Sequence, residues 1–176
     1  MKQITVNLYD IDELKAQYPD GYEKALEKWR DNNDYYGLNG YMQEYCKELI
    51  TENQIKLVGG YKMQVFYSLS YCQGDGAMFE GTFLYRDKYY VTVRQSGHYY
   101  HYNSKDIIVE EEDIDGNEVD TDEIEKEFND IYIDICKKLA ISGYNFIEAE
   151  NEEDNILETM RANEYTFESD GTMNNG

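Results

Sequence analysis

Two adjoining stretches decide the fold of this chain: YKMQVFYSLSY (residues 61–71) and CQGDGAMFEGTFLY (residues 72–85). In the first, every second residue from Tyr61 to Tyr71 is apolar or aromatic, and the residues between them are mostly polar. A period of two is typical of a β-strand that buries one face. Because Asp-Gly at 75–76 is a strong hairpin signal, we expect residues 78–85 to return as the antiparallel partner strand.

Similar alternation continues on both sides of this hairpin. Short turn sequences at 86–88 and 96–97 separate further strand-like segments. The sequence therefore predicts an antiparallel meander of about five to six strands. Its further strands are expected at residues 89–95, 98–102 and 107–111, and separate short strands are expected at 4–8 and 165–168.

Helical periodicity surrounds the strands and predicts an α+β fold with helices packed on one side of the sheet. At 176 residues, we expect a single domain over residues 1–168 and a flexible tail at 169–176. The expected helices are residues 11–17, 22–32, 38–50, 121–143 and 152–162. The expected buried stripe of the longest helix is Ile124, Phe128, Ile131, Ile135 and Leu139.

The charge of the chain is concentrated in its C-terminal part. Residues 1–105 are near neutral, with 14 Asp and Glu against 12 Lys and Arg, whereas residues 106–176 hold 23 against 4. Together these give the net charge of −21. Such acidity argues against direct binding of nucleic acid or of an anionic membrane, since both require Lys or Arg. It favours a basic protein partner.

Two acidic segments are the main candidates for that contact. The first is a loop with Glu110, Glu111, Glu112, Asp113 and Asp115. The second is a row at helical spacing, which we expect no neighbouring cation to offset. Its members are Glu123, Glu127, Asp130 and Asp134. The alternative explanation, a charged surface that serves only solubility, stays open.

The acidic loop does not match a calcium-binding loop. With Asp113 at position 1, Gly116 falls at position 4, whereas the EF-hand requires glycine at position 6. We therefore expect no metal site and no cofactor.

The Gly74–Gly81 segment is the alternative site. Glycines around Asp75 would allow a ligand to approach the backbone, with Asp75 and Glu80 as a carboxylate pair. The same residues also fit an ordinary hairpin turn. A small-ligand or enzymatic site here is the alternative function.

The remaining chemistry-bearing residues predict no catalytic site. His98 and His101 are the only histidines, and strand alternation would place them on opposite faces. The three cysteines, Cys46, Cys72 and Cys136, are far apart, as in a reduced intracellular protein. We find no signal peptide and no apolar run of membrane-spanning length, so we expect a cytoplasmic protein. Tyrosines on both faces of residues 89–102 indicate a protein interface or a self-association patch, as in a homodimer.

Three segments resemble a family of uncharacterised phage and prophage proteins: LYDIDEL (8–14), YSLSYCQGDGAMFEG (67–81) and ANEYTFESDG (162–171). The resemblance implies a phage or mobile-element context and no particular chemistry. By analogy with small acidic anti-CRISPR proteins, we expect a non-enzymatic inhibitor acting in the cytoplasm of an infected bacterial host. Its acidic face would mimic DNA or RNA and bind the basic nucleic-acid channel of a host defence protein, a CRISPR effector or a restriction enzyme.

Overall fold

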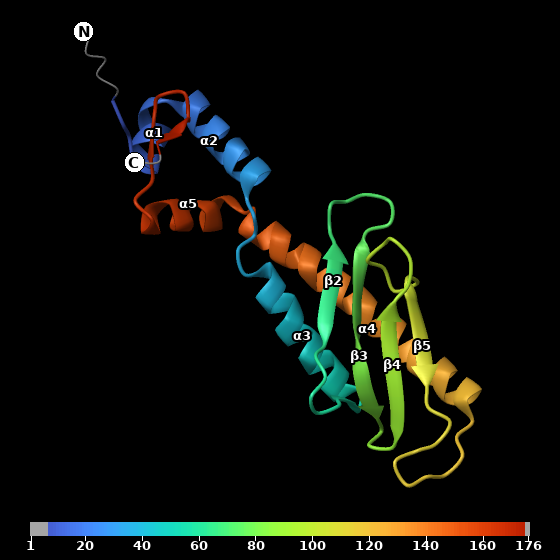
Figure 1. Cartoon of the computed structure of the whole chain (residues 1–176). Coiled ribbons are helices and arrows are strands. Elements are labelled where there is room, and N and C mark those ends of the chain that lie inside the picture. Colours follow the sequence, from blue (N-terminus) through green and yellow to red (C-terminus); the bar gives the residue numbers. More distant parts are fainter. Residues whose placement is uncertain (1–6, 175–176) are drawn as a thin grey trace, which may run out of the picture. The chain divides into compact units, whose positions relative to one another are not determined.

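The alternating residues form a β-hairpin in the computed structural model, which describes residues 7–174 (Figure 1). The model has a mixed α+β fold, as predicted, and divides into two compact units. We call Gly37–Asn145 the sheet unit. We call the residues up to Tyr36, together with those from Phe146 onward, the helical unit. The opening strand expected at 4–8 falls mostly outside the described residues.

The sheet unit is organised around one long strand, β3 (Gly76–Tyr85). β4 pairs along one edge of β3, and β5 pairs with β4. The opposite edge of β3 is shared, because β1 pairs with Phe83–Tyr85 and β2 pairs with Gly76–Glu80. All these pairings are antiparallel. The other strands are β1 (Ile55–Leu57), β2 (Gln64–Ser68), β4 (Tyr89–Gln95) and β5 (Lys105–Val109).

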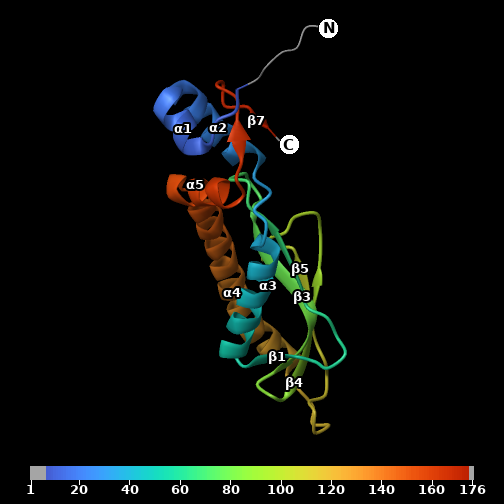
Figure 2. The ribbon, with the colours of Figure 1, turned by 90° about the vertical axis from the view of Figure 1, so that its left-hand side faces the viewer.

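Two helices, α3 (Leu38–Glu52) and α4 (Thr121–Glu150), cover one face of this sheet (Figure 2). Four members of the expected α4 stripe are buried, but Ile131 is partly exposed, and the neighbouring Tyr132 is fully buried instead. The Tyr132 hydroxyl donates to the carbonyl oxygen of Phe79 (3.0 Å) and accepts from the Phe79 amide (3.2 Å). Tyr132 can therefore bury its ring because β3 supplies partners for its polar end.

The helical unit packs three helices around a second core. Its elements are α1 (Ile11–Gln17), α2 (Pro19–Asn32), α5 (Glu153–Ala162), β6 (Thr166–Phe167) and β7 (Met173–Asn174). Leu14, Leu26, Ile156 and Phe167 lie in this core. The segment around Ser169 approaches α2 so closely that a Cβ added at Gly21 would clash with the carbonyl oxygen of Ser169. Strand β7 lies within residues 169–176, the segment that the sequence analysis predicts to be a flexible tail.

Two local predictions are wrong. Residues 98–102 are not a strand but part of a loop from Ser96 to Ser104, whose ends are joined by a backbone hydrogen bond of 2.8 Å. Helix α4 does not end near Gly143 but continues to Glu150. Gly143 faces Leu69, whose Cδ1 would lie only 2.5 Å from an added Cβ, so close packing and not helix termination accounts for this glycine.

Candidate acidic interaction surface

The acidic loop between β5 and α4 has a defined backbone conformation. An isolated bridge joins Glu112 and Glu118, and the Val119 amide donates to the carbonyl oxygen of Glu111 (2.9 Å). Inside this bridge, the Asp113 amide donates to the carbonyl oxygen of Asn117 (2.9 Å). The loop is therefore a small closed hairpin.

The side chain of Asp113 stabilises this hairpin by accepting hydrogen bonds from residues of the same loop. Its Oδ1 accepts hydrogen bonds from the backbone amides of Asp115 and Asn117, both at 2.9 Å, and from Nδ2 of Asn117 at 3.1 Å. Lys88 Nζ lies 3.3 Å from its Oδ2. The hydrogen bonds from Asn117, the backbone amide foremost, lower the pKa of Asp113 to about 2. Asp113 is buried, so this carboxylate organises the loop and is not available to a partner.

The other four candidates in the loop face solvent. Glu110, Glu111, Glu112 and Asp115 are exposed, and none forms an ion pair among residues 7–174. The Lys88 side chain, which reaches this loop, pairs with Asp113 and with none of these four carboxylates.

The helical row on α4 is divided into paired and unpaired members. Glu123 and Asp130 are exposed and unpaired within the described part of the chain. Oε2 of Glu127 lies 2.9 Å from Nη1 of Arg86, and Oδ2 of Asp134 lies 2.7 Å from Nζ of Lys138. The expectation that no cation offsets this row is therefore wrong for two of its four carboxylates.

One β-turn anchors both acidic segments. Arg86 and Asp87 have positive φ angles of 53° and 55°, as in the two-residue turns that fit the twist of a hairpin. From this turn, Arg86 reaches Glu127 on α4 and Lys88 reaches Asp113 in the loop. Sequence reasoning missed this role of Arg86 and Lys88, since their acidic partners are some 25 to 41 residues away and no local pattern indicates the pairing.

The alternative pair, Asp75 and Glu80, is not brought together. Asp75 lines a hollow of about 370 Å³ with Cys72 and His98, whereas Glu80 lines a separate hollow with Lys62 and Arg94. The Glu80 carboxylate accepts from the Gln95 amide (3.2 Å).

The Asp75 carboxylate is hydrogen-bonded by groups of its own hairpin and by Tyr144 on α4. Its carboxylate accepts hydrogen bonds from Ser68 Oγ (2.8 Å), the Cys72 amide (2.9 Å) and the Tyr144 hydroxyl (3.0 Å). Desolvation by burial acts to raise the pKa of Asp75, but the hydrogen bonds outweigh it and hold the pKa below its ordinary value. These contacts give the carboxylate a structural role.

The histidines and cysteines do not form a cluster that could hold a metal. His98 is exposed and His101 is half-buried, with its ring against Gly76. Burial raises the pKa of Cys136 to about 12, so this thiol is protonated at neutral pH. Among residues 7–174, no group of three or more His, Cys, Asp or Glu side chains is arranged to bind a metal ion.

Comparison of the chain with models of protein families, with curated proteins and with solved structures gives no match. Within residues 7–174, no helix has the length and apolar character needed to cross a membrane.

Proposed function

We propose that this protein is a non-enzymatic binding protein whose acidic surface docks on a basic, nucleic-acid-binding surface of a partner protein. The acidic surface consists of Glu110, Glu111, Glu112, Asp115, Glu123 and Asp130. The observation that carries the proposal is the Asp113 network, which fixes the conformation of the loop that carries four of these six carboxylates.

Preorganisation matters because ordering a mobile charged loop on binding would reduce affinity. Here the loop is already closed by internal hydrogen bonds before any partner arrives. Its exposed carboxylates can therefore meet Lys and Arg side chains at little further cost in conformational entropy.

The charge density supports fast, salt-sensitive association. Residues 106–134 contain 14 Asp and Glu residues and one Lys. On α4, the rise of about 1.5 Å per residue places Glu123 and Asp130 about 10 Å apart along the axis. This separation is close to the Debye length of about 10 Å at 0.1 M salt, so at low salt their fields add at a partner surface.

A basic surface of this kind is what nucleic-acid-binding proteins provide, and the acidic surface would compete with the phosphate backbone for it. In the phage context that the resemblance implies, the partner would be a CRISPR effector or a restriction enzyme, and the effect would be inhibition of its binding to nucleic acid.

A charge-matched pair of variants tests the proposal. One combines Glu111→Lys, Asp115→Lys, Glu123→Lys and Asp130→Lys, and the other combines Glu23→Lys, Glu27→Lys, Asp31→Lys and Glu48→Lys. All eight positions are exposed and lie outside the ion pairs of the described chain, so both variants change the net charge equally. The tagged proteins are incubated with purified CRISPR effectors and restriction endonucleases, and binding and DNA cleavage are measured.

We expect the wild type and the second variant to bind a target and inhibit its cleavage, and the first variant to lose both activities. Duplex DNA should displace the wild type, and binding should weaken steeply between 50 and 200 mM salt, as it does when many charges are neutralised. Equal behaviour of the two variants, or binding that duplex DNA does not displace, would contradict the proposal.

A further inference from the structure

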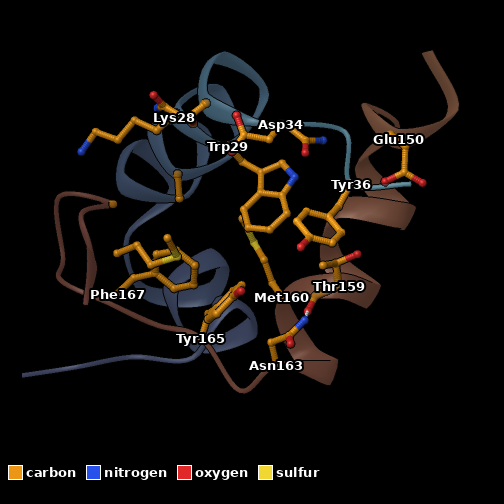
Figure 3. A pocket seen from close by; sticks show the side chains of 15 residues that line it. Lys28, Trp29, Asp34, Tyr36, Glu150, Thr159, Met160, Asn163, Tyr165 and Phe167 are labelled. Carbon is orange, nitrogen blue, oxygen red and sulfur yellow. Dashed lines mark hydrogen bonds between the residues drawn. The ribbon is translucent and has the colours of Figure 1, made fainter. Parts of the chain in front are cut away.

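The helical unit contains a hollow of about 840 Å³, which sequence reasoning did not detect (Figure 3). This volume is within the range of pockets that hold small organic ligands. Residues from α2, from the segment after it, from the end of α4, from α5 and from the chain beyond α5 line it. The pocket lies entirely within the helical unit, so the fold of that unit alone forms it.

Four aromatic side chains, Trp29, Tyr36, Tyr165 and Phe167, line the pocket. Trp29 from α2 and Tyr165 lie with ring centroids 5.9 Å apart and with an interplanar angle of 48°. Both rings are half-buried, and the side chains of Met160 and Phe167 are buried beside them. Tyr36 lies at the rim of the pocket and is 99% exposed. In Figure 3, Tyr36 and Phe167 lie on opposite sides of Trp29. Trp29 and Tyr165 pack against the core of the helical unit on one side, and their partly exposed surfaces line the pocket on the other.

The charges at the pocket are mainly negative. Asp34 and Glu150 line it, and neither carboxylate forms an ion pair among the described residues. Lys28, the one cation in the lining, donates from Nζ to Thr172 Oγ1 (3.1 Å) and extends away from Trp29 in Figure 3. An anionic ligand would thus face two carboxylates with no cation directed at it.

We propose that this pocket binds a small organic cation, with a quaternary or alkyl ammonium group against the faces of Trp29 and Tyr165. The negative faces of indole and phenol rings attract such cations, and partial burial strengthens the attraction. Asp34 and Glu150 add a favourable field, and the partly exposed Met173 offers apolar surface to the rest of the ligand. A neutral ligand would gain the apolar contacts but nothing from the two carboxylates.

The chain offers a direct probe of this site, because Trp29 is its only tryptophan. The protein is titrated with choline chloride, with its neutral isostere 3,3-dimethylbutan-1-ol, and with sodium chloride at the same ionic strength. Tryptophan fluorescence is recorded in each titration. We expect a saturable change with choline, binding at least tenfold weaker with the isostere, and no saturable change with sodium chloride. Equal affinity for choline and the isostere would overturn the proposal.

Matched variants locate the binding site. Asp34→Asn and Glu150→Gln should each weaken choline binding several-fold, measured by calorimetry as well as fluorescence. Asp31→Asn removes an exposed carboxylate from α2 that does not line the pocket, and it should bind as the wild type does. Circular dichroism verifies that each variant is folded. If Asp31→Asn weakens binding as much as the two pocket variants, the charge effect is general and the assigned site is wrong. The four-Lys variant of the acidic surface should retain choline binding, which separates this inference from the proposed function.

Discussion

Lys88 is attached to the acidic loop at two points around Asp113. Its Nζ lies 3.3 Å from Asp113 Oδ2, and its carbonyl oxygen accepts a hydrogen bond from the amide of Ile114 (3.1 Å). The β3–β4 turn and the loop are thereby held together by both a side chain and the backbone. As a consequence, Lys88 is used within the fold, and the outer carboxylates of the loop form no ion pair among residues 7–174.

Removing the Asp113 carboxylate should loosen the loop without unfolding the sheet. In Asp113→Ala, the amides of Asp115 and Asn117 lose their acceptor, so their hydrogen exchange should become at least tenfold faster. Asp115→Ala, which removes an exposed carboxylate from the same loop, should leave the exchange of the Asn117 amide unchanged. Similar exchange in the two variants would show that Asp113 does not organise the loop. Hydrogen exchange measured by NMR provides the comparison.

The pH dependence of stability should also reveal Asp113. Its pKa in the folded protein is lowered to about 2, whereas an unfolded Asp has a pKa of about 3.9. The folded state therefore binds the proton less readily, and the contribution of Asp113 to stability is present above about pH 4 and is lost as the pH falls towards 2. Urea unfolding of the wild type and Asp113→Asn between pH 2 and 6 should give curves that converge at low pH. A constant separation would contradict the assigned pKa.

Tyr132→Phe should destabilise the sheet unit by about 1–3 kcal/mol, because the buried amide and carbonyl oxygen of Phe79 each lose a hydrogen-bonding partner. Tyr99→Phe is the control, since Tyr99 is 63% exposed, and its effect should stay within about 0.5 kcal/mol. Urea unfolding midpoints measure both. A Tyr132→Phe variant as stable as Tyr99→Phe would show that the hydroxyl contributes nothing.

Two helical glycines should respond to alanine in opposite ways. Gly21 and Gly40 both occupy the third position of a helix, in α2 and α3 respectively. A Cβ at Gly21 would meet the backbone of Ser169, whereas a Cβ at Gly40 has no atom within 4 Å. We expect Gly21→Ala to cost about 1–3 kcal/mol. Gly40→Ala should stabilise by up to about 1 kcal/mol, because alanine favours the helix. Thermal unfolding of both variants tests the contrast, and a stabilising Gly21→Ala would contradict the close approach.

Much of the secondary structure could be predicted because its causes are local. The alternation at 61–71 predicts β2 from neighbouring residues alone, although only Gln64–Ser68 form the strand. The Asp-Gly pair correctly indicates that the chain returns as β3, but it is not a two-residue turn, because residues 69–75 form the connection and Gly76 is already paired with Ser68. Either Asp10 or Asp12 could cap the helix that the sequence predicts through Gln17, and in the structure Asp10 caps α1 with a capping box to Glu13. The prediction of a strand at 98–102 was wrong because alternation does not specify with which strand a segment pairs. In the structure β4 pairs with Lys105–Val109 instead, which leaves 98–102 in the connecting loop.

The candidate sites show the limit of sequence reasoning more sharply. The sequence by itself determined that the acidic residues are concentrated at 110–134. Within Glu110–Asp115 the acidic residues are neighbours of similar chemistry, so the sequence does not distinguish a buried carboxylate from an exposed one. Only the tertiary structure decided that Asp113 is buried against Lys88 while Glu111 remains in solvent. The pocket around Trp29 depends in the same way on Tyr165, which lies 136 positions further along the chain. Backbone preferences act between near neighbours, whereas burial and ion pairing depend on partners that are distant in sequence and are brought close only by the fold.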